Sequence, residues 1–399
     1  MFLTLLLPMY VVVVVGLEPA RPIIEPVKAI KRHKEMWHDF KLPTLAHRQE
    51  ILSQGAAEFH RDHSTATRQR LALMQQPNLA CDEACQNVAA KNITQERAEE
   101  MMVYEKVDDN GVKTIVRLPL DEGFVDYING WATDSEKLLQ ETNESHNRRK
   151  REIFDFDTRF PIHDPLMYDE IPFSAAVVLS TGCSGVLIGP QYVLTAAHCI
   201  HNGKKYIDKM KNVKAGFRRD RNLEPGDDVS EAFYWIRATE AFLPYEWTKS
   251  GKKGKKLPVE KDYAVIKLKR ESDRAYLNVS VGTPENVASG TRLHIPAFDR
   301  HDDPTLIYRF CRVADGTQEV MYQDCDSEEA AVGAGVYVRR WDREAKQWAR
   351  KVVAIYGGQA SFYRDHADRK KSNVALRITP LKFAQICFWT TGSYGGCKG

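Results

Sequence analysis

The stretch Thr195-Ala196-Ala197-His198-Cys199 holds the side chain best suited to do chemistry in this chain. The His198 imidazole can take up a proton near neutral pH, and a disulfide at Cys199 would hold it in place. Asp262 begins the alternating segment Asp-Tyr-Ala-Val-Ile-Lys-Leu-Lys, which predicts a strand with a carboxylate at its head. A Ser-His-Asp hydrolase needs an imidazole that accepts the serine proton and a buried carboxylate that fixes its tautomer. His198 and Asp262 are therefore the candidates for these two roles.

At these residues the sequence resembles the chymotrypsin-like serine peptidases, for which Thr-Ala-Ala-His-Cys is a highly specific motif. Within that family it is similar to the group of serine protease 23 and inactive serine protease 35, from about residue 148 to the end. The resemblance implies a double β-barrel and, in active members, hydrolysis of peptide bonds. The segments that carry it are residues 148–153, 157–160, 180–185, 193–206, 308–311 and, the longest, 373–387.

The nucleophile is missing from this pattern. The group's Gly-Ala-Ser-Gly-Ser-Gly-Val-Tyr reads Ala-Ala-Val-Gly-Ala-Gly-Val-Tyr at residues 330–337, which puts Val332 at the position of the reactive serine. A valine has no heteroatom and cannot form an acyl-enzyme. Ser327 lies upstream, but an alignment shift that made it the nucleophile would break the match at residues 333–337. The sequence therefore predicts an inactive homologue, and the alternative is an active endopeptidase with an unrecognised nucleophile.

Other positions of the expected active site also differ from the family pattern. The resemblance places the two N–H donors of the oxyanion hole at Ala330 and Val332, where Ala330 replaces a glycine. Ala331 replaces the aspartate that often pairs with the new N-terminus in chymotrypsin-like enzymes, although the nearer group also has alanine. Gly357 stands where that group has serine, near the expected substrate-binding strand. Asp326 lies where a carboxylate can select basic side chains, but beside a cysteine it is first interpreted as a surface residue of a disulfide loop.

The N-terminus has the pattern of a secretory signal. Residues 1–16 are almost wholly apolar, and this run is too short to span a bilayer comfortably as a helix. We expect a signal peptide over residues 1–20, cleaved after Gly16 or Ala20, and a secreted, extracellular protein. The alternative is an uncleaved anchor.

The polar segment that follows predicts a removable pro-region. Residues 21–151 are expected to be mostly helical or irregular, with helices near residues 50–61 and 66–75. The run Arg148-Arg149-Lys150-Arg151 closes this segment and is a target for a basic-specific processing protease. Cleavage after Arg151 would leave Glu152 as the new N-terminus of a peptidase domain over residues 152–399.

Eight cysteines on an oxidising route predict disulfides and no metal site. Three residues separate Cys81 from Cys85, so the two resemble a metal or redox pair only loosely. Sequons at Asn92, Asn143 and Asn278 predict N-glycosylation on the same route. The four neighbouring pairs expected as disulfides are Cys81–Cys85, Cys183–Cys199, Cys311–Cys325 and Cys387–Cys397.

The fold expected from residue 171 onward is all-β. Short β-branched segments separated by turn residues indicate a barrel or sandwich, and the resemblance narrows this to the chymotrypsin-like double β-barrel. Thr379-Pro380 then opens a helix over residues 381–388, with proline at a favourable first-turn position. The expected strands lie at residues 175–179, 185–188, 192–194, 234–237, 263–268, 291–295, 335–340, 352–356 and 374–378.

The composition gives no argument for nucleic acid, because the net charge is only +3 over 399 residues. We find no phosphate loop or cofactor motif, so no cofactor, metal or membrane span is expected. Basic runs at residues 252–256 and 369–371 predict either solvated loops or a glycosaminoglycan site. The expected partner is a protein ligand. It is either a protease or an inhibitor captured through the cleft, or a matrix component, for which the cleft would be incidental.

Overall fold

The computed structural model describes 79–81, 85, 93–118, 120, 123–126, 128–130, 159–219, 227–251, 257–300, 305–342, 346–363, 369–394 and 397. Of residues 359–363 and 369–372 only the backbone is described. All of them belong to the unit Asp62–Gly399. The expected signal peptide, the helices near residues 50–61 and 66–75, the processing site Arg148–Arg151 with Glu152, the sequons at Asn92 and Asn143, and residues 252–256 lie outside the described residues.

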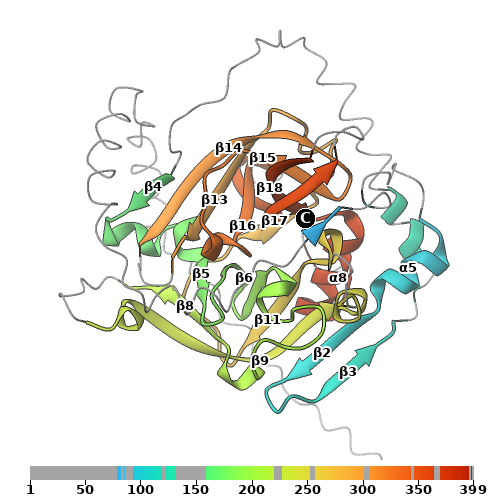
Figure 1. Cartoon of the computed structure of the whole chain (residues 1–399), viewed down its shortest axis with the longest axis horizontal. Helices are drawn as coiled ribbons and strands as arrows, with labels where there is room; N and C mark the ends of the chain where they lie inside the picture. The colour runs from blue at the N-terminus through green and yellow to red at the C-terminus, as the bar shows by residue number, and fades with distance from the viewer. Residues whose placement is uncertain are drawn as a thin grey trace, which may run out of the picture. The chain divides into compact units, whose positions relative to one another are not determined.

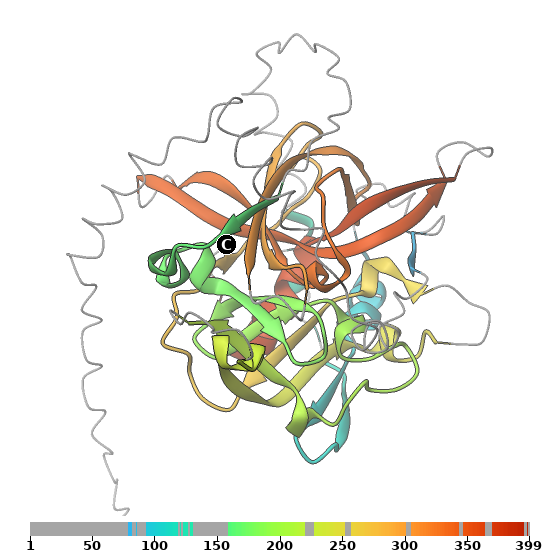
Figure 2. The ribbon, with the colours of Figure 1, turned by 60° about the vertical axis from the view of Figure 1, so that its left-hand side comes forward.

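The described strands form two closed antiparallel barrels, as the sequence predicted (Figure 1). In the first barrel the strand order is β11-β7-β6-β5-β8-β9, and pairing of β11 with β9 closes the ring. Figure 2 shows this green and yellow barrel below the orange and red one. The strands are β5 (Ala176–Leu179), β6 (Ser184–Gly189), β7 (Tyr192–Thr195), β8 (Lys214–Arg218), β9 (Phe233–Pro244) and β11 (Ala264–Leu268).

The second barrel has the order β17-β16-β13-β14-β15-β18 and is closed by pairing of β17 with β18. Short strands β1, β4, β10 and β12 add to its edges. The barrel strands are β13 (Arg292–Phe298), β14 (Leu306–Gly316), β15 (Val320–Gln323), β16 (Gly335–Asp342), β17 (Gln347–Tyr363) and β18 (Arg369–Arg377). The edge strands are β1 (Leu79–Ala80), β4 (Arg159–Ile162), β10 (Leu257–Pro258) and β12 (Asn278–Val279).

All nine expected segments contain strand residues, but the sequence did not predict β8, β14 and β15. Strand β8 is short and contains Gly216, and glycine has a low preference for strands. Gly216 is nevertheless required, because an added Cβ would lie 2.9 Å from the Trp235 ring across the pair β8–β9. In β14 the apolar alternation is interrupted by Arg309, which is fully buried.

The C-terminal helix α8 (Pro380–Thr391) follows the predicted signals. The Thr379 side chain caps it by accepting from the Lys382 N–H, and Pro380 occupies the first turn. Gly392, with φ of 76°, ends it in the left-handed conformation that glycine adopts without strain. The other short helices are α7 (Tyr245–Thr248), η1 (Pro165–Asp169), η2 (Phe173–Ala175), η3 (Ala197–Cys199), η4 (Met210–Asn212), η5 (Val229–Ala232), η6 (Val259–Lys261) and η7 (Glu329–Ala331).

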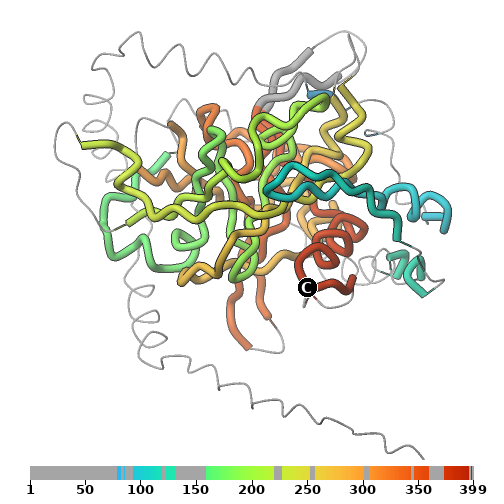
Figure 3. Tube along the Cα trace, turned by 90° about the horizontal axis from the view of Figure 1, so that it is seen from below, coloured from blue at the N-terminus to red at the C-terminus, as the bar shows by residue number. Residues whose placement is uncertain are grey.

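Part of the segment before the basic run is built into the first barrel. Helix α5 (Gln95–Met102) agrees with the helical expectation, but β2 (Tyr104–Asp108) and β3 (Lys113–Val116) form a hairpin that pairs with β9. Figure 3 shows this cyan hairpin, and the red helix α8 is visible in the same view. The Tyr104 ring packs against Phe242 and Trp389, at centroid distances of 6.2 and 5.6 Å. Strands in this segment were not predicted, because its residues show no sustained apolar alternation and β3 is mostly exposed.

Candidate active site

His198 and Asp262 lie in direct contact between neighbouring strands. His198 belongs to η3, directly after β7, and Asp262 follows η6, directly before β11. Strands β7 and β11 pair with Ala264 opposite Thr195, which brings the two side chains together. His198 Nδ1 lies 2.7 Å from Asp262 Oδ2, and the His198 backbone N–H donates to Oδ1 at 2.8 Å. Both residues are buried, so the imidazole has one orientation.

The Cys183–Cys199 disulfide fixes the histidine turn to strand β6. Its Cα atoms are 5.9 Å apart, and both cysteines are fully buried. Possible ligand atoms of Cys183, His198 and Cys199 lie within 4.8 Å of one another. The two sulfurs are bonded to each other and so supply no thiolate for a metal. The cluster is a structural clamp.

The turn η7 contains the positions expected for the nucleophile and the oxyanion hole. Val332 is 2% exposed and packs in the core with Ala331. The Ala330 N–H donates to the Asp299 carbonyl at 3.2 Å, and the Val332 N–H donates to the Glu329 carbonyl at 3.3 Å. An oxyanion hole needs N–H groups that point at an empty position. Here both expected donors are used inside the protein.

Ser184 ties the turn η7 to the first barrel. Its hydroxyl donates to the Ala330 carbonyl at 2.9 Å, and its backbone N–H donates to the Val332 carbonyl at 2.8 Å. Gly333, with φ of 88°, makes the closest approach, because an added Cβ would lie 2.3 Å from both the Ser184 carbonyl and Thr195 Oγ1. These contacts hold Val332 in place beside the disulfide.

The hydroxyl groups around the turn all bond to groups other than His198. The Thr195 hydroxyl donates to the Ser184 carbonyl at 2.8 Å, and Ser184 bonds as described above. The Ser327 hydroxyl is hydrogen-bonded to the Tyr356 hydroxyl. Within the part of the chain that the structure describes, His198 Nε2 has no hydrogen-bond partner.

A buried ion pair lies beneath the turn. Arg309 is fully buried, and its Nη2 bonds to Asp299, whose backbone carbonyl accepts from Ala330. Burial raises the pKa of the Asp299 carboxyl, and the adjacent Arg309 guanidinium opposes that rise. Arg159 reaches the same carboxylate at 3.4 Å and Glu328 at 2.9 Å. These ion pairs fix the position of Asp299, whose backbone carbonyl accepts the hydrogen bond from the Ala330 N–H.

The remaining expected residues are placed as follows. Asp326 is exposed directly after Cys325, outside the loop that the Cys311–Cys325 disulfide closes, and Asn278 is exposed at the start of β12. Gly357 lies on β17 and packs against Val374. Of the basic run 369–371 only the backbone is described. The structure joins all four expected cysteine pairs, which are Cys81–Cys85, Cys183–Cys199, Cys311–Cys325 and Cys387–Cys397.

Comparison with known proteins gives three kinds of match. Residues 163–354 match the family model named Trypsin. Serine protease 23 from Homo sapiens is 34% identical over 314 residues, covering 76% of this chain and 80% of that protein. Inactive serine protease 35 from Macaca mulatta is 34% identical over 366 residues, covering 80% of this chain and 86% of that protein. The chain belongs to the chymotrypsin-like serine peptidase family. Among solved structures, that of a Glu endopeptidase in complex with MPD matches with a TM-score of 0.42 and 17% sequence identity. The match covers 59% of this chain and 97% of the endopeptidase chain.

Two residues that shape this chymotrypsin-like site were not predicted. Ser184 looked like one more polar residue of a family segment, and only the fold shows that it joins the two barrels. Tyr356 looked like an ordinary apolar strand residue, yet its hydroxyl reaches Ser327. No local pattern in the sequence indicated either contact, because both partners lie far apart in the chain.

Proposed function

We propose that this chain is a secreted serine-peptidase homologue that hydrolyses no peptide bonds and acts by binding another protein. The observation that carries the proposal is that Val332 stands at the position where the family pattern has the reactive serine. The Val332 side chain ends in methyl groups, and no acyl-enzyme can form on it. In a Ser-His-Asp enzyme, loss of the nucleophile lowers turnover by about 10⁶-fold.

The state of the oxyanion position supports the same conclusion. The expected N–H donors at Ala330 and Val332 bond to the carbonyls of Asp299 and Glu329. Loss of a single oxyanion-hole donor costs about 10²- to 10³-fold in turnover. A substrate would have to break these internal bonds before the site could stabilise a tetrahedral intermediate.

The space expected for a substrate side chain is also restricted. In a peptidase of this family the specificity pocket would lie between the substrate-binding strand and the loop that precedes the nucleophile. Tyr356 extends from that strand to Ser327 in that loop and is 2% exposed. The Tyr356 ring therefore takes up room that a bound side chain would need.

The alternative, an endopeptidase with a different nucleophile, needs a hydroxyl that His198 can deprotonate. The hydroxyls of Ser184, Thr195, Ser327 and Tyr356 lie around the turn, and each bonds to a group other than His198. This favours the binding role over the enzymatic one. A retained fold with a fixed histidine still presents a shaped surface to a protein ligand.

No described helix is both long and apolar enough to cross a bilayer. The secreted location rests on the expected signal peptide, and N-terminal sequencing of the protein recovered from culture medium tests it. We expect a start after Gly16 or Ala20, or at Glu152 after processing.

The functional proposal is tested by incubating the processed, secreted protein with a peptide library of all residue types, using mass spectrometry to detect new termini. We expect no cleavage above that of the His198→Ala variant. In parallel, binding of purified serine peptidases and their reactive-loop inhibitors is measured by surface plasmon resonance. Sequence-specific cleavage that the His198→Ala variant lacks would refute the proposal. Absence of cleavage together with no binding in the whole panel would refute its binding half.

A further inference from the structure

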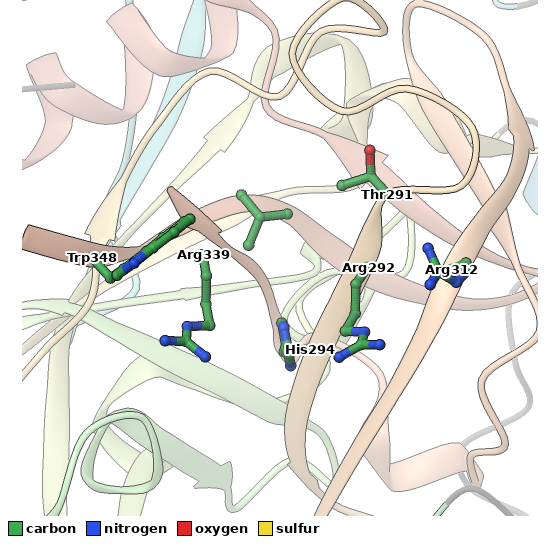
Figure 4. Close-up of a pocket in the computed structure, with 7 residues that line it drawn as sticks. Thr291, Arg292, His294, Arg312, Arg339 and Trp348 are labelled. Atoms are coloured by element: carbon green, nitrogen blue, oxygen red, sulfur yellow. The ribbon is translucent and has the colours of Figure 1, made fainter. Parts of the chain in front are cut away.

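Four arginines form a row across the outer face of the second barrel, far along the chain from His198. Arg312 lies opposite Arg292 in the pair β14–β13, and Arg339 lies opposite Arg350 in the pair β16–β17. Strands β13 and β16 pair with His294 opposite Tyr337, and continuing that register by two residues brings Arg292 opposite Arg339. Figure 4 shows Arg339, His294, Arg292 and Arg312 following one another along the lining of a hollow. The volume of this hollow is about 560 Å³.

Aromatic rings accompany the row. Trp341 and Trp348 lie opposite each other on β16 and β17, are 51% and 58% exposed, and pack edge to face at a centroid distance of 5.8 Å. The Arg339 guanidinium lies 5.8 Å from the Trp348 ring. These stacking contacts orient the cation and leave its N–H groups available to a ligand.

Three of these arginines have no carboxylate partner among the described residues. Arg292, Arg312 and Arg339 form no ion pair there, and Arg350 is hydrogen-bonded to Tyr337. Like charges directly opposite on neighbouring strands are destabilising. Burial lowers the pKa of His294 to about 4. The positive charges of Arg292, Arg339 and Arg350 lower it further, and no carboxylate opposes them. This face therefore carries an electrostatic cost that a bound polyanion would remove.

The geometry selects the kind of polyanion. Neighbouring strands lie about 4.8 Å apart, so four strands spread the charges over roughly 14 Å, which is more than one small anion can cover. Strands β13 and β16 each have a hydrogen-bonded neighbour on both sides, so a peptide cannot be bound there by strand addition. Recognition must come from side chains that hold repeated anionic groups, with exposed indole rings beside them that can stack on sugar rings.

We propose that this face binds a sulfated glycosaminoglycan chain, which runs across β14, β13, β16 and β17 with its sulfate groups on the arginine row. A guanidinium can donate two parallel hydrogen bonds to an anionic oxygen pair, which suits sulfate. The site is independent of the His198 cleft and of the basic runs at residues 252–256 and 369–371.

The experiment measures binding of the full-length secreted protein to a size-defined heparin octasaccharide by isothermal titration calorimetry at several NaCl concentrations. The test variant is Arg292→Gln with Arg339→Gln. The matched control is Lys214→Gln with Arg237→Gln, which removes two charges from an exposed cross-strand pair on the first barrel. A third variant changes the four lysines within residues 252–256 to glutamine. Thermal melting checks that each variant folds.

We expect the test variant to lose at least about tenfold in affinity at physiological salt, and to reduce the slope of log Kd against log salt by about two. The control and the lysine variant should bind within about twofold of wild type. Equal losses in the test and control variants, or loss only in the lysine variant, would overturn the proposal. A polyglutamate peptide of equal charge that binds as tightly as heparin would also overturn it, because it would point to an acidic protein. If the test variant fails to fold, Arg292→Lys with Arg339→Lys keeps the charge and should still weaken binding through loss of the bidentate contacts.

Discussion

The Tyr356 hydroxyl is hydrogen-bonded to the Ser327 hydroxyl, so a buried phenol ring joins strand β17 to the loop that leads into the turn η7. The same tyrosine accepts the Gly333 N–H through its backbone carbonyl at 2.8 Å. Tyr356 therefore contacts the turn on both sides of Val332. The region that would bind substrate in a peptidase is here a packed and internally bonded part of the protein.

Restoring the serine alone should not restore an enzyme. We expect Val332→Ser to remain at the background rate on peptide substrates, because the Ala330 and Val332 N–H groups still donate to internal carbonyls and Tyr356 still fills its space. The measurement is turnover of a fluorogenic peptide mixture, with Val332→Ala as the folded control. Turnover by Val332→Ser that disappears when His198→Ala is added would show that the site is preformed after all.

Cleavage after Arg151 should leave residues 93–116 attached to the peptidase domain. Strand β2 pairs with β9, Tyr104 packs against Trp389, and the Tyr206 hydroxyl donates to Glu105 at 2.7 Å. No disulfide among the described residues crosses the cleavage site, so noncovalent contacts such as these would hold the two pieces together.

Size-exclusion chromatography of the cleaved protein, followed by denaturing gel electrophoresis, checks this. Both pieces should elute in one peak. Tyr104→Ala should weaken the association, and Ile115→Ala, which changes a 48% exposed side chain, should not. Free release of the N-terminal piece from the wild-type protein would contradict the prediction.

Stability should fall as pH rises through neutrality because of Glu260. Burial raises the pKa of this carboxyl from 4.5 to about 7. Between these two values the folded chain holds a proton that the unfolded chain has lost, so the contribution to stability is complete below pH 4.5 and is lost as pH rises through 7. Glu260→Gln removes this titration. The difference in free energy of unfolding between the variant and wild type should therefore be more favourable to the variant at pH 8 than at pH 5, by up to about 3 kcal/mol.

Urea unfolding at pH 5 and pH 8 measures the difference. Glu271→Gln, at an exposed position, is the control and should leave the pH dependence of wild type unchanged. A Glu260→Gln variant with the same stability advantage at both pH values would show that Glu260 is ionised in the folded protein throughout.

The buried ion pair between Asp299 and Arg309 should contribute strongly to stability. Asp299→Asn leaves the fully buried Arg309 without its carboxylate, and breaking one partner of a buried pair costs about 3–5 kcal/mol. Denaturant unfolding should show this loss, whereas Asp273→Asn, at an exposed aspartate, should stay within about 0.5 kcal/mol of wild type. A loss below 1 kcal/mol for Asp299→Asn would mean that water reaches the Arg309 guanidinium.

The sequence predicted those parts of the molecule that depend on local pattern. Alternation of apolar residues located nine strands, and the Thr379 cap with Pro380 located the C-terminal helix. The His198–Asp262 contact followed from the order of two motifs and a family resemblance. The Ser184 bridge, the Tyr356–Ser327 bond and the arginine row depend on register between strands far apart in the chain. Such register is fixed by packing, and a single sequence does not display it.

We infer that no nucleophile is presented to His198, and covalent labelling with a serine-reactive phosphonate is the sharpest test of this inference. The processed wild-type protein, His198→Ala and an active chymotrypsin-like peptidase are treated in parallel, and the adduct is measured by intact mass. We expect an adduct on the active peptidase alone. One stoichiometric adduct on the wild-type protein, absent from His198→Ala, would contradict it.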